Sequence, residues 1–243
     1  MLSIEFKEKK SKEIIKEAFE RFDNLGLFWS GGKDSTVMLY LVLDVIEENN
    51  FEEPYVVILD PIPFEENVKF QTELVRKLGL KKVVDFRELI KEEYKEKAKP
   101  FGLDKKKCCY WLKVKPLNDF IEKYKIDGLF VAIRWDEHPE RGKEKYFSER
   151  ENPKHVRIHP MLHWSWLDVW LYIKKRNLPV NPLYFKGYTS LGCKICTSIV
   201  KKDGFKNIDE IIEFIKEKKV SERAGRDIDK ERIMENLRKL GYF

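Results

Sequence analysis

The sequence has 243 residues, of which 42% are hydrophobic and 37% are charged, with a formal net charge of +6 at pH 7. This length suits one α/β domain with a small appendage, and the charged fraction exceeds the quarter that is usual in soluble chains. The sequence contains no apolar run of membrane-spanning length and no signal peptide at its start. We therefore expect a cytoplasmic protein whose positive charge suits anionic partners such as nucleotides.

Apolar runs alternate with helical patterns along the first 175 residues. Strands are expected over residues 26–29, 55–59, 82–85, 128–133 and 156–159. Helices are expected over residues 10–22, 35–43, 64–78, 87–97, 105–124 and 164–175. This alternation predicts a parallel sheet with helices on both of its faces.

The pattern changes near residue 176, where loops containing proline and glycine begin. Two charged helical segments follow, near residues 207–219 and 229–240. We expect residues 1–175 to form a nucleotide-binding α/β domain, with an N-terminal helix within residues 1–24. Residues 176–243 are expected to form a C-terminal extension folded over the sheet edge.

A glycine-containing loop separates the first expected strand from the next helix, with the sequence Ser30-Gly31-Gly32-Lys33-Asp34-Ser35. Loops at the carboxyl ends of strands are where open α/β sheets bind anions. The two glycines permit unusual backbone angles, and the loop amides would cradle a phosphate. Ser30 and Ser35 add hydroxyl donors, Lys33 adds a positive charge, and Asp34 is a candidate Mg²⁺ ligand or helix cap. The alternative is an ordinary strand-to-helix turn capped by Asp34 or Ser35.

These six residues resemble the phosphate loop of the PP-loop ATP pyrophosphatase superfamily. The resemblance implies a fold like that of the adenine nucleotide alpha-hydrolases, which binds ATP or an adenylyl nucleotide. It also implies that Asp60, at the end of the second strand, lies beside the nucleotide. Pro61 follows Asp60 here, whereas relatives often carry Thr-Gly.

The four cysteines fall into two groups, the adjacent pair Cys108 and Cys109 and the motif Cys193-x-x-Cys196. In a reducing compartment such groups favour metal binding or catalysis over disulfides. Adjacent helical residues diverge by about 100°, so a shared metal needs a local distortion or a cluster that spans both sulfurs. We expect a [4Fe–4S] cluster; a Cys₄ zinc site and unrelated free thiols are the alternatives. Segments 108–117 and 187–197 are similar to segments of iron–sulfur adenylyl-sulfate reductases.

Basic residues beyond the loop point to a second anion. Arg134 follows the fourth expected strand, and its fork-shaped guanidinium suits phosphate or sulfate. The strip from Arg134 through Ser148, which includes Asp136, resembles one in the small subunit of sulfate adenylyltransferase. The tail that contains Arg223 and Arg226 resembles the C-terminus of the same subunit. We expect Lys33 and Arg134 to be catalytic, and Asp136, Arg223 and Arg226 to contribute to nucleotide binding.

Residues 25–243 as a whole resemble the family of phosphoadenosine-phosphosulfate (PAPS) reductases and sulfate adenylyltransferases. The resemblance implies an enzyme of sulfur metabolism that forms or cleaves an adenylyl–sulfur linkage, using ATP, adenylyl sulfate or PAPS. Reductases attack with a cysteine on a mobile tail, yet no cysteine follows Cys196. If all four thiols bind a cluster, that covalent mechanism cannot run on this chain alone.

Two other functions remain open at this point. One is ATP-dependent sulfur transfer to tRNA or a small molecule, although the sequence shows no RNA-binding module. The other is a non-catalytic nucleotide-binding subunit. The partners to consider are a GTPase subunit, an electron donor and further copies of the chain.

Overall fold

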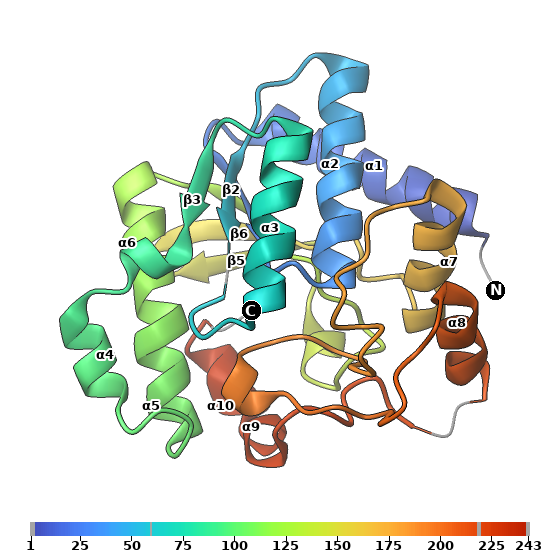
Figure 1. Cartoon of the computed structure of the whole chain (residues 1–243). Helices are drawn as coiled ribbons and strands as arrows, with labels where there is room; N and C mark the ends of the chain where they lie inside the picture. Colours follow the sequence, from blue (N-terminus) through green and yellow to red (C-terminus); the bar gives the residue numbers. More distant parts are fainter. Residues whose placement is uncertain (1–2, 59, 218–219, 242–243) are drawn as a thin grey trace.

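The computed structural model describes residues 3–58, 60–217 and 220–241. Its centre is a six-stranded sheet with the order β3-β2-β1-β4-β6-β5 (Figure 1). The strands are β1 (Leu25–Trp29), β2 (Tyr55–Ile58), β3 (Val83–Asp85), β4 (Gly128–Phe130), β5 (Phe147–Glu151) and β6 (Lys154–Ile158). All neighbouring pairs are parallel except β5 and β6, which pair antiparallel at one edge.

Strand β5 was not expected from the sequence. Only one of its five residues is buried, and three of its five side chains are charged. An edge strand of this kind lacks the continuous apolar run of a strand that is covered on both faces. The fourth expected strand is also shorter than predicted, because β4 ends at Phe130 instead of residue 133.

The helices occupy most of the predicted positions. They are α1 (Ile4–Arg21), α2 (Lys33–Asn49), α3 (Glu65–Leu78), α4 (Glu92–Ala98), α5 (Lys105–Cys109), α6 (Lys115–Tyr124), α7 (Trp166–Arg176), α8 (Ile208–Lys216), α9 (Ile228–Arg232) and α10 (Met234–Lys239). A π-helical turn over Tyr110–Val114 joins α5 to α6. The charged segment expected near 229–240 is divided into α9 and α10, while residues 218–219 and 242–243 lie outside the described part.

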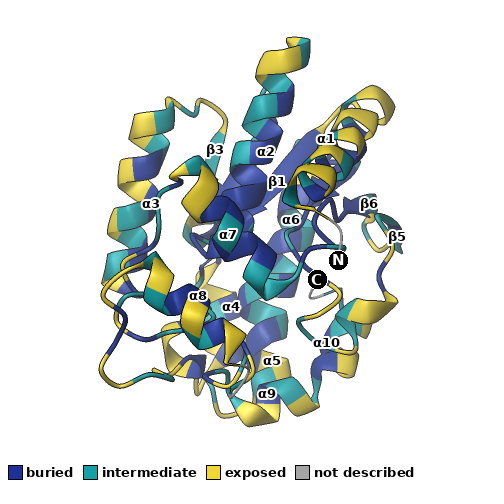
Figure 2. Ribbon diagram, turned by 90° about the vertical axis from the view of Figure 1, so that its right-hand side faces the viewer, coloured by how far each residue is buried: buried dark blue, intermediate teal, exposed yellow. Residues whose placement is uncertain are grey.

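Two apolar clusters lie on opposite faces of the sheet. Alternate residues of β1 divide between them, since Leu27 and Trp29 belong to one cluster and Phe28 to the other. The first cluster includes residues of α1, α2, α3, α7 and α8, and the second includes residues of α4, α5, α6 and α10. Figure 2 shows β1 as a fully buried strand between these layers. The parallel sheet with helices on both faces is therefore confirmed.

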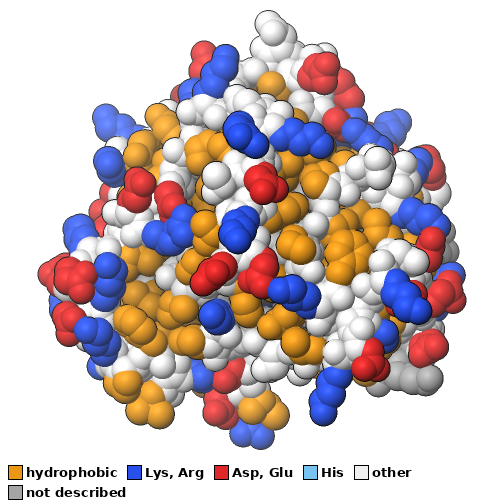
Figure 3. All heavy atoms as spheres, viewed as in Figure 1, with side chains coloured by type: hydrophobic (Ala, Val, Ile, Leu, Met, Phe, Trp, Pro, Cys, Tyr) orange, Lys and Arg blue, Asp and Glu red, His pale blue; other side chains and the backbone are white. Residues whose placement is uncertain are grey.

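The surface contains many charges of both signs. On the face drawn in Figure 3, lysine and arginine side chains alternate with aspartate and glutamate, and no extended block of one sign stands out. Within the described residues, no helix is long and apolar enough to cross a bilayer.

Helix α7 fixes the loop that follows β4. The helix begins at a capping box, in which Ser165 and Asp168 exchange hydrogen bonds between side chain and backbone. The next amide, that of Trp166, donates to Asp136 Oδ2 at 2.8 Å. The segment containing Arg134 and Asp136 is thereby held against the start of α7.

Candidate functional site

The loop between β1 and α2 has a backbone conformation that one of its glycines makes possible. Gly31 has φ +74°, and a Cβ atom there would lie 2.2 Å from Asn67 Oδ1. Any other residue would therefore be strained and would collide with Asn67. Gly32 has φ −78° and ψ 162°, an ordinary conformation, so of the two glycines that permit unusual backbone angles only Gly31 adopts one.

Gly32 is also the N-cap residue of α2, and it has no side chain that could bond to the first helical amides. The alternative in which Asp34 or Ser35 caps the helix is thus wrong, because α2 begins at Lys33, before both residues. The Ser30 and Ser35 hydroxyls lie 3.0 Å apart, and the Ser35 hydroxyl also accepts from the Ser30 amide at 3.2 Å. The two serines therefore close the loop on itself.

Three residues from distant segments hold the loop in place. Asn67 on α3 donates to the carbonyl of Ser30 at 3.1 Å, and Asn181 donates to the carbonyl of Gly31 at 3.1 Å. The Tyr184 hydroxyl accepts from the backbone amide of Lys33 at 2.9 Å. Sequence reasoning did not single out Asn67, Asn181 or Tyr184, since each acts through a contact that is distant along the chain.

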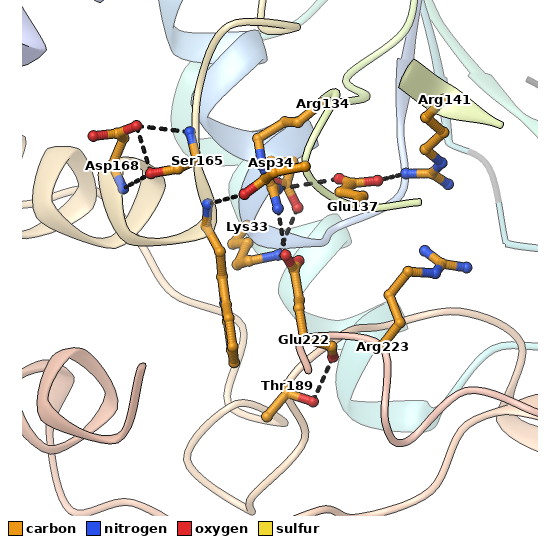
Figure 4. Close-up of polar contacts among 12 residues, drawn as sticks. Lys33, Asp34, Arg134, Glu137, Arg141, Ser165, Asp168, Thr189, Glu222 and Arg223 are labelled. Atoms are coloured by element: carbon orange, nitrogen blue, oxygen red, sulfur yellow. Dashed lines mark hydrogen bonds and ion pairs between the residues drawn. The ribbon is translucent and has the colours of Figure 1, made fainter. Parts of the chain in front are cut away.

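The side chains of Lys33 and Arg134 meet in a buried network of charges. Lys33 Nζ lies 2.7 Å from Asp34 Oδ2 and also pairs with Glu222. Arg134 pairs with Asp34 and Glu222, and with Asp136 at 2.9 Å. The side chains of Lys33 and Arg134 are 2% and 0% exposed. Figure 4 shows both cations converging on Asp34 and Glu222.

Lys33 and Asp34 keep their charges at neutral pH. Burial alone would raise the pKa of Asp34, but the charges of Arg134 and Lys33 lower it to about 2. Burial alone would lower the pKa of Lys33, yet Asp34 and Glu222 raise it above its ordinary value. Breaking such a network by removing one partner is costly, since a buried charge is then left uncompensated.

A pocket opens beside this network. It is lined by most of the loop, by apolar side chains and by cationic groups: Phe28, Ser30, Gly32, Lys33, Asp34, Ser35, Asp60, Phe64, Asn67, Lys113, Val114, Leu117, Val131, Ala132, Ile133, Glu137, Arg141, Leu183, Tyr184, Ser190, Leu191, Gly192, Glu222, Arg223, Arg226 and Gly241. Arg134 and Asp136 are not among the lining residues. Arg134 lies behind Asp34 and Glu222. Asp136 bonds to Arg134 and to the first amide of α7.

Asp60 lies where the sequence placed it, on the pocket wall after β2. Its Oδ2 accepts a hydrogen bond from Asn67 at 2.7 Å, while its Oδ1 has no hydrogen-bond partner among the described residues. Burial raises the pKa of this carboxyl group, and the positive charge of Lys113 opposes the rise. Asp60 thus brings a buried carboxylate to the pocket wall.

Three carboxylates form a group that fits a divalent cation. Oxygen atoms of Asp34, Glu137 and Glu222 lie within 4.8 Å of one another. Oxygen ligands of this kind suit Mg²⁺. Glu137 comes from the loop after β4 and also pairs with Arg141, and Glu222 comes from the C-terminal tail. The sequence analysis proposed Asp34 for this role but gave none to Glu137 or Glu222.

Two arginines of the tail reach the same pocket. Arg223 is held by Glu231, with its Nε 2.7 Å from Oε2. Arg226 covers Gly192, where a Cβ atom would lie 2.2 Å from Arg226 Nη1. The Nε and Nη1 atoms of Arg226 are buried and have no hydrogen-bond partner in the described part of the chain. Figure 4 shows Arg141 and Arg223 extending to the same side of the charge network.

The four cysteines form a second site, which we call the thiol centre (Cys108, Cys109, Cys193 and Cys196). All four are buried, at 6–8% exposure, and none forms a disulfide. The π-helical turn begins directly after Cys109, which supplies the local distortion that the sequence analysis required. Burial raises the pKa of the Cys108 and Cys196 thiols, and the neighbouring cysteines contribute to the rise.

The spacing of the thiols bears on the metal that they fit. Thiolates around one zinc ion lie about 3.8 Å apart, given Zn–S bonds of about 2.3 Å in a tetrahedron. Among the described residues, the group whose ligand atoms approach within 4.8 Å of one another is the carboxylate trio, not the thiols. No three of the four thiol sulfurs lie within 4.8 Å of one another, so the thiols as placed do not form the tetrahedral arrangement of a zinc site.

The fold and the loop together define an α/β protein of the PP-loop type. A family model described as the phosphoadenosine phosphosulfate reductase domain matches residues 24–199. This match covers well over half of the sequence, and the chain belongs to that family.

Curated relatives match almost the whole chain. Sulfate adenylyltransferase subunit 2 of Marinomonas sp. (strain MWYL1) is 28% identical, and the alignment covers 97% of this chain and 96% of the relative. Sulfate adenylyltransferase subunit 2 of Bacteroides thetaiotaomicron is also 28% identical, with the same coverage.

Solved structures share the fold. Candida glabrata FMN adenylyltransferase has a TM-score of 0.66 at 19% identity, over 92% of this chain and 89% of that one. PAPS reductase from Candida auris has a TM-score of 0.56 at 20% identity, over 82% of this chain and 98% of that one. These structures support the predicted adenine nucleotide alpha-hydrolase-like architecture.

Proposed function

We propose that this protein is an adenylyltransferase of sulfur metabolism, which joins an adenylyl group from ATP to sulfate. The observation that carries the proposal is the composition of the pocket. One part of the pocket wall is the phosphate-type loop, which includes Lys33. Another part of the wall carries the three arginines Arg141, Arg223 and Arg226. One ligand with two separate anionic groups, or two anionic ligands side by side, would match this arrangement.

The nucleotide is proposed to lie with its phosphates at Ser30–Ser35. The apolar wall formed by Phe28, Val131 and Ile133 suits a purine ring. The unpartnered Oδ1 of Asp60 is an acceptor for a nucleotide donor group. Arg226, whose Nε and Nη1 lack partners, is proposed to bind the oxyanion that attacks the α-phosphorus.

In this reaction a sulfate oxygen attacks the α-phosphorus of ATP. A phosphorus–oxygen bond to sulfate forms, the bond to the β-phosphate oxygen breaks, and pyrophosphate leaves. Lys33 would stabilise charge on the transferred and leaving phosphates. Arg134 lies one layer deeper, so it would act by holding Asp34 and Glu222 and by taking up phosphate charge when these carboxylates turn away.

The charge network suggests how Mg²⁺ and ATP enter together. At present Asp34 and Glu222 neutralise Lys33 and Arg134. When Mg²⁺·ATP binds, the phosphates would pair with the two cations, and the metal would pair with the carboxylates of Asp34, Glu137 and Glu222. This exchange keeps each buried charge compensated, which a buried site requires.

The thiol centre is proposed to hold a [4Fe–4S] cluster through Cys108, Cys109, Cys193 and Cys196. Such a cluster supplies a redox-active or purely structural group when bound. All four cysteines of the sequence belong to this centre, so a reductive mechanism with a separate thiol nucleophile has no candidate here. This is the reason for preferring adenylyl transfer over reduction, and the names of the curated relatives agree with it.

The test of the activity is exchange of labelled pyrophosphate into ATP, with and without sulfate. We expect exchange that depends on sulfate. The assay is run with and without a GTPase partner subunit, because the relatives are named as one subunit of an enzyme. Release of sulfite from adenylyl sulfate in the presence of a thiol donor, without exchange, would instead indicate a reductase. Exchange that requires tRNA would indicate sulfur transfer to RNA.

The test of the cofactor is the metal content of protein purified without oxygen. We expect a brown protein with about four irons per chain. The protein is expected to occur in the reducing cytoplasm, where thiols stay available for a metal. A colourless preparation that contains stoichiometric zinc and no iron would rule out the cluster.

A further inference from the structure

One short segment of the tail connects the nucleotide pocket with the thiol centre. We call residues 221–227 the strap. At its first end, Glu222 pairs with Lys33 and Arg134. Its backbone carbonyl also accepts a hydrogen bond from the Thr189 hydroxyl at 2.7 Å. The side chain of Glu222 is 8% exposed, so this end of the strap is buried in the charge network.

The other end of the strap is bound to the loop of Cys193 and Cys196. Arg226 forms an isolated antiparallel bridge with Thr197, and the Ser198 amide donates to the carbonyl of Gly225 at 2.8 Å. The Asp227 amide donates to the carbonyl of Cys196 at 3.2 Å. The strap therefore pairs by an antiparallel bridge with the backbone that carries half of the thiol centre.

The strap also contacts the helix that carries the other two thiols. Asp227 Oδ2 lies 2.8 Å from Lys105 Nζ, at the start of α5, which ends with Cys108 and Cys109. One residue of the strap thus pairs with the segments that hold both cysteine groups. If the thiols are drawn together around a metal, Asp227 and its neighbours are fixed with them.

The strap fits closely along its length. A Cβ atom at Gly225 would lie 2.4 Å from the carbonyl oxygen of Ser198 and 2.9 Å from Val200. Arg223 and Arg226, on either side of Gly225, both line the nucleotide pocket. A shift of the strap would therefore move two pocket arginines and Glu222 together.

From these contacts we propose that the thiol centre positions the strap, and that Glu222 is a positioning residue that holds Lys33 and Arg134 for the nucleotide. Metal bound at the thiol centre then strengthens nucleotide binding, because it fixes the strap, which carries Arg223 and Arg226 into the pocket wall. By thermodynamic linkage, nucleotide must strengthen metal binding by the same factor. The inference rests on the proposed function, since it takes the pocket to be a nucleotide site.

The experiment compares ATP binding in two forms of the protein. Calorimetry measures the Kd for ATP with Mg²⁺, first for the protein as isolated without oxygen and then after its metal has been removed by a chelator. We expect the Kd to rise at least about tenfold on metal removal, which is a typical size for coupling between two sites. Zn²⁺ added alone to the stripped protein is the probe if no iron is found.

A variant of the strap shows whether the coupling passes through it. Gly225→Val keeps every cysteine and every pocket side chain but cannot pack against Ser198. Its Kd for ATP is expected to be weak and nearly the same with and without metal. Ala224→Val is the matched control, because Ala224 is exposed in the same segment, and it should keep the tenfold effect. If Gly225→Val does not fold, Asp227→Asn, which loses the Lys105 ion pair, serves in its place.

The reciprocal measurement needs no catalysis. ATP should slow the release of metal to a chelator by about tenfold in the wild-type protein and not in Gly225→Val. The inference fails if metal removal leaves the Kd of the wild type unchanged, if Gly225→Val shows the same fold-change as the wild type, or if the centre takes up neither iron nor Zn²⁺. A wild-type protein that binds neither ATP nor adenylyl sulfate would refute the proposed function itself, and this inference with it.

Discussion

The charge network around Lys33 and Arg134, which we call the loop end of the sheet, and the thiol centre are both buried. The two sites are nevertheless stabilised in opposite ways. At the loop end, Lys33 and Arg134 have carboxylate partners on three segments of the chain, so the protein neutralises its own charges. At the thiol centre, burial raises the pKa of Cys108 and Cys196, which favours the neutral thiols. The first site is complete without a ligand, whereas the second would be completed by the metal that we propose for it.

This difference affects how each site responds to change. Removing a charge at the loop end leaves its partners buried and uncompensated, so both folding and function are affected. Removing one thiol from the metal-free centre leaves only a small apolar gap, so the loss appears mainly in metal binding. The following experiments test this contrast, beginning with the largest expected effect.

Replacement of Lys33 by Ala should have the largest effect on activity. Sulfate-dependent pyrophosphate exchange should fall by about a thousandfold, because a charge that stabilises the transferred phosphate is lost. Lys69→Ala, on the exposed surface of α3, is the control and should be unchanged. A Lys33→Ala rate within threefold of the wild type would leave only a non-catalytic nucleotide-binding role.

Replacement of Arg134 by Met should lower the free energy of unfolding of the metal-free protein by about 3 kcal/mol, since Asp34 and Glu222 lose a buried partner. Urea denaturation gives this value. Cys109→Ala, measured in the same way, should cost no more than about 1 kcal/mol while abolishing stoichiometric metal binding. Equal losses in the two variants would contradict the contrast between the sites.

Replacement of Gly192 by Ala should have a smaller effect, confined to ligand binding. Its Cβ atom would displace the Arg226 guanidinium, which lies 2.2 Å from that position. We expect about a tenfold weaker affinity for adenylyl sulfate, the cost of one misplaced charged contact. Gly142→Ala is a matched control, because the nearest atom to its added Cβ is 4.0 Å away. Similar affinities in the two variants would show that Arg226 does not bind the ligand.

Local sequence predicted the parts of the fold that depend on neighbouring residues. The run ending at Trp29 and the helix after it have strong apolar patterns, so β1, the glycine loop and the start of α2 were placed within two residues. The end of α2 lies at Asn49, six residues beyond the expected end at residue 43. Strand β5 was missed because its charged residues show no such pattern and its pairing with β6 decides its conformation. The length of β4 was overestimated because the apolar run continues to residue 133, whereas the pairing that defines the strand ends at Phe130.

The candidate site was predicted only in part, for a similar reason. Asp60 and Arg223, whose role in nucleotide binding stays a prediction from the family resemblance, both line the pocket. Arg134 was expected to face the ligand, but it lies behind Asp34 and Glu222. Glu222 directly precedes Arg223 in the sequence and was given no role, since nothing in the sequence indicates that it reaches a lysine 189 positions away.

The sequence by itself determined the α/β class, the place of the phosphate-type loop and the grouping of the cysteines, because these follow from short-range periodicity and spacing. The tertiary structure alone decided which charges neutralise Lys33, how the two cysteine pairs meet beside a π-helical turn, and that the strap joins both sites. Burial and ion pairing depend on which distant segments pack together. No local pattern specifies that packing.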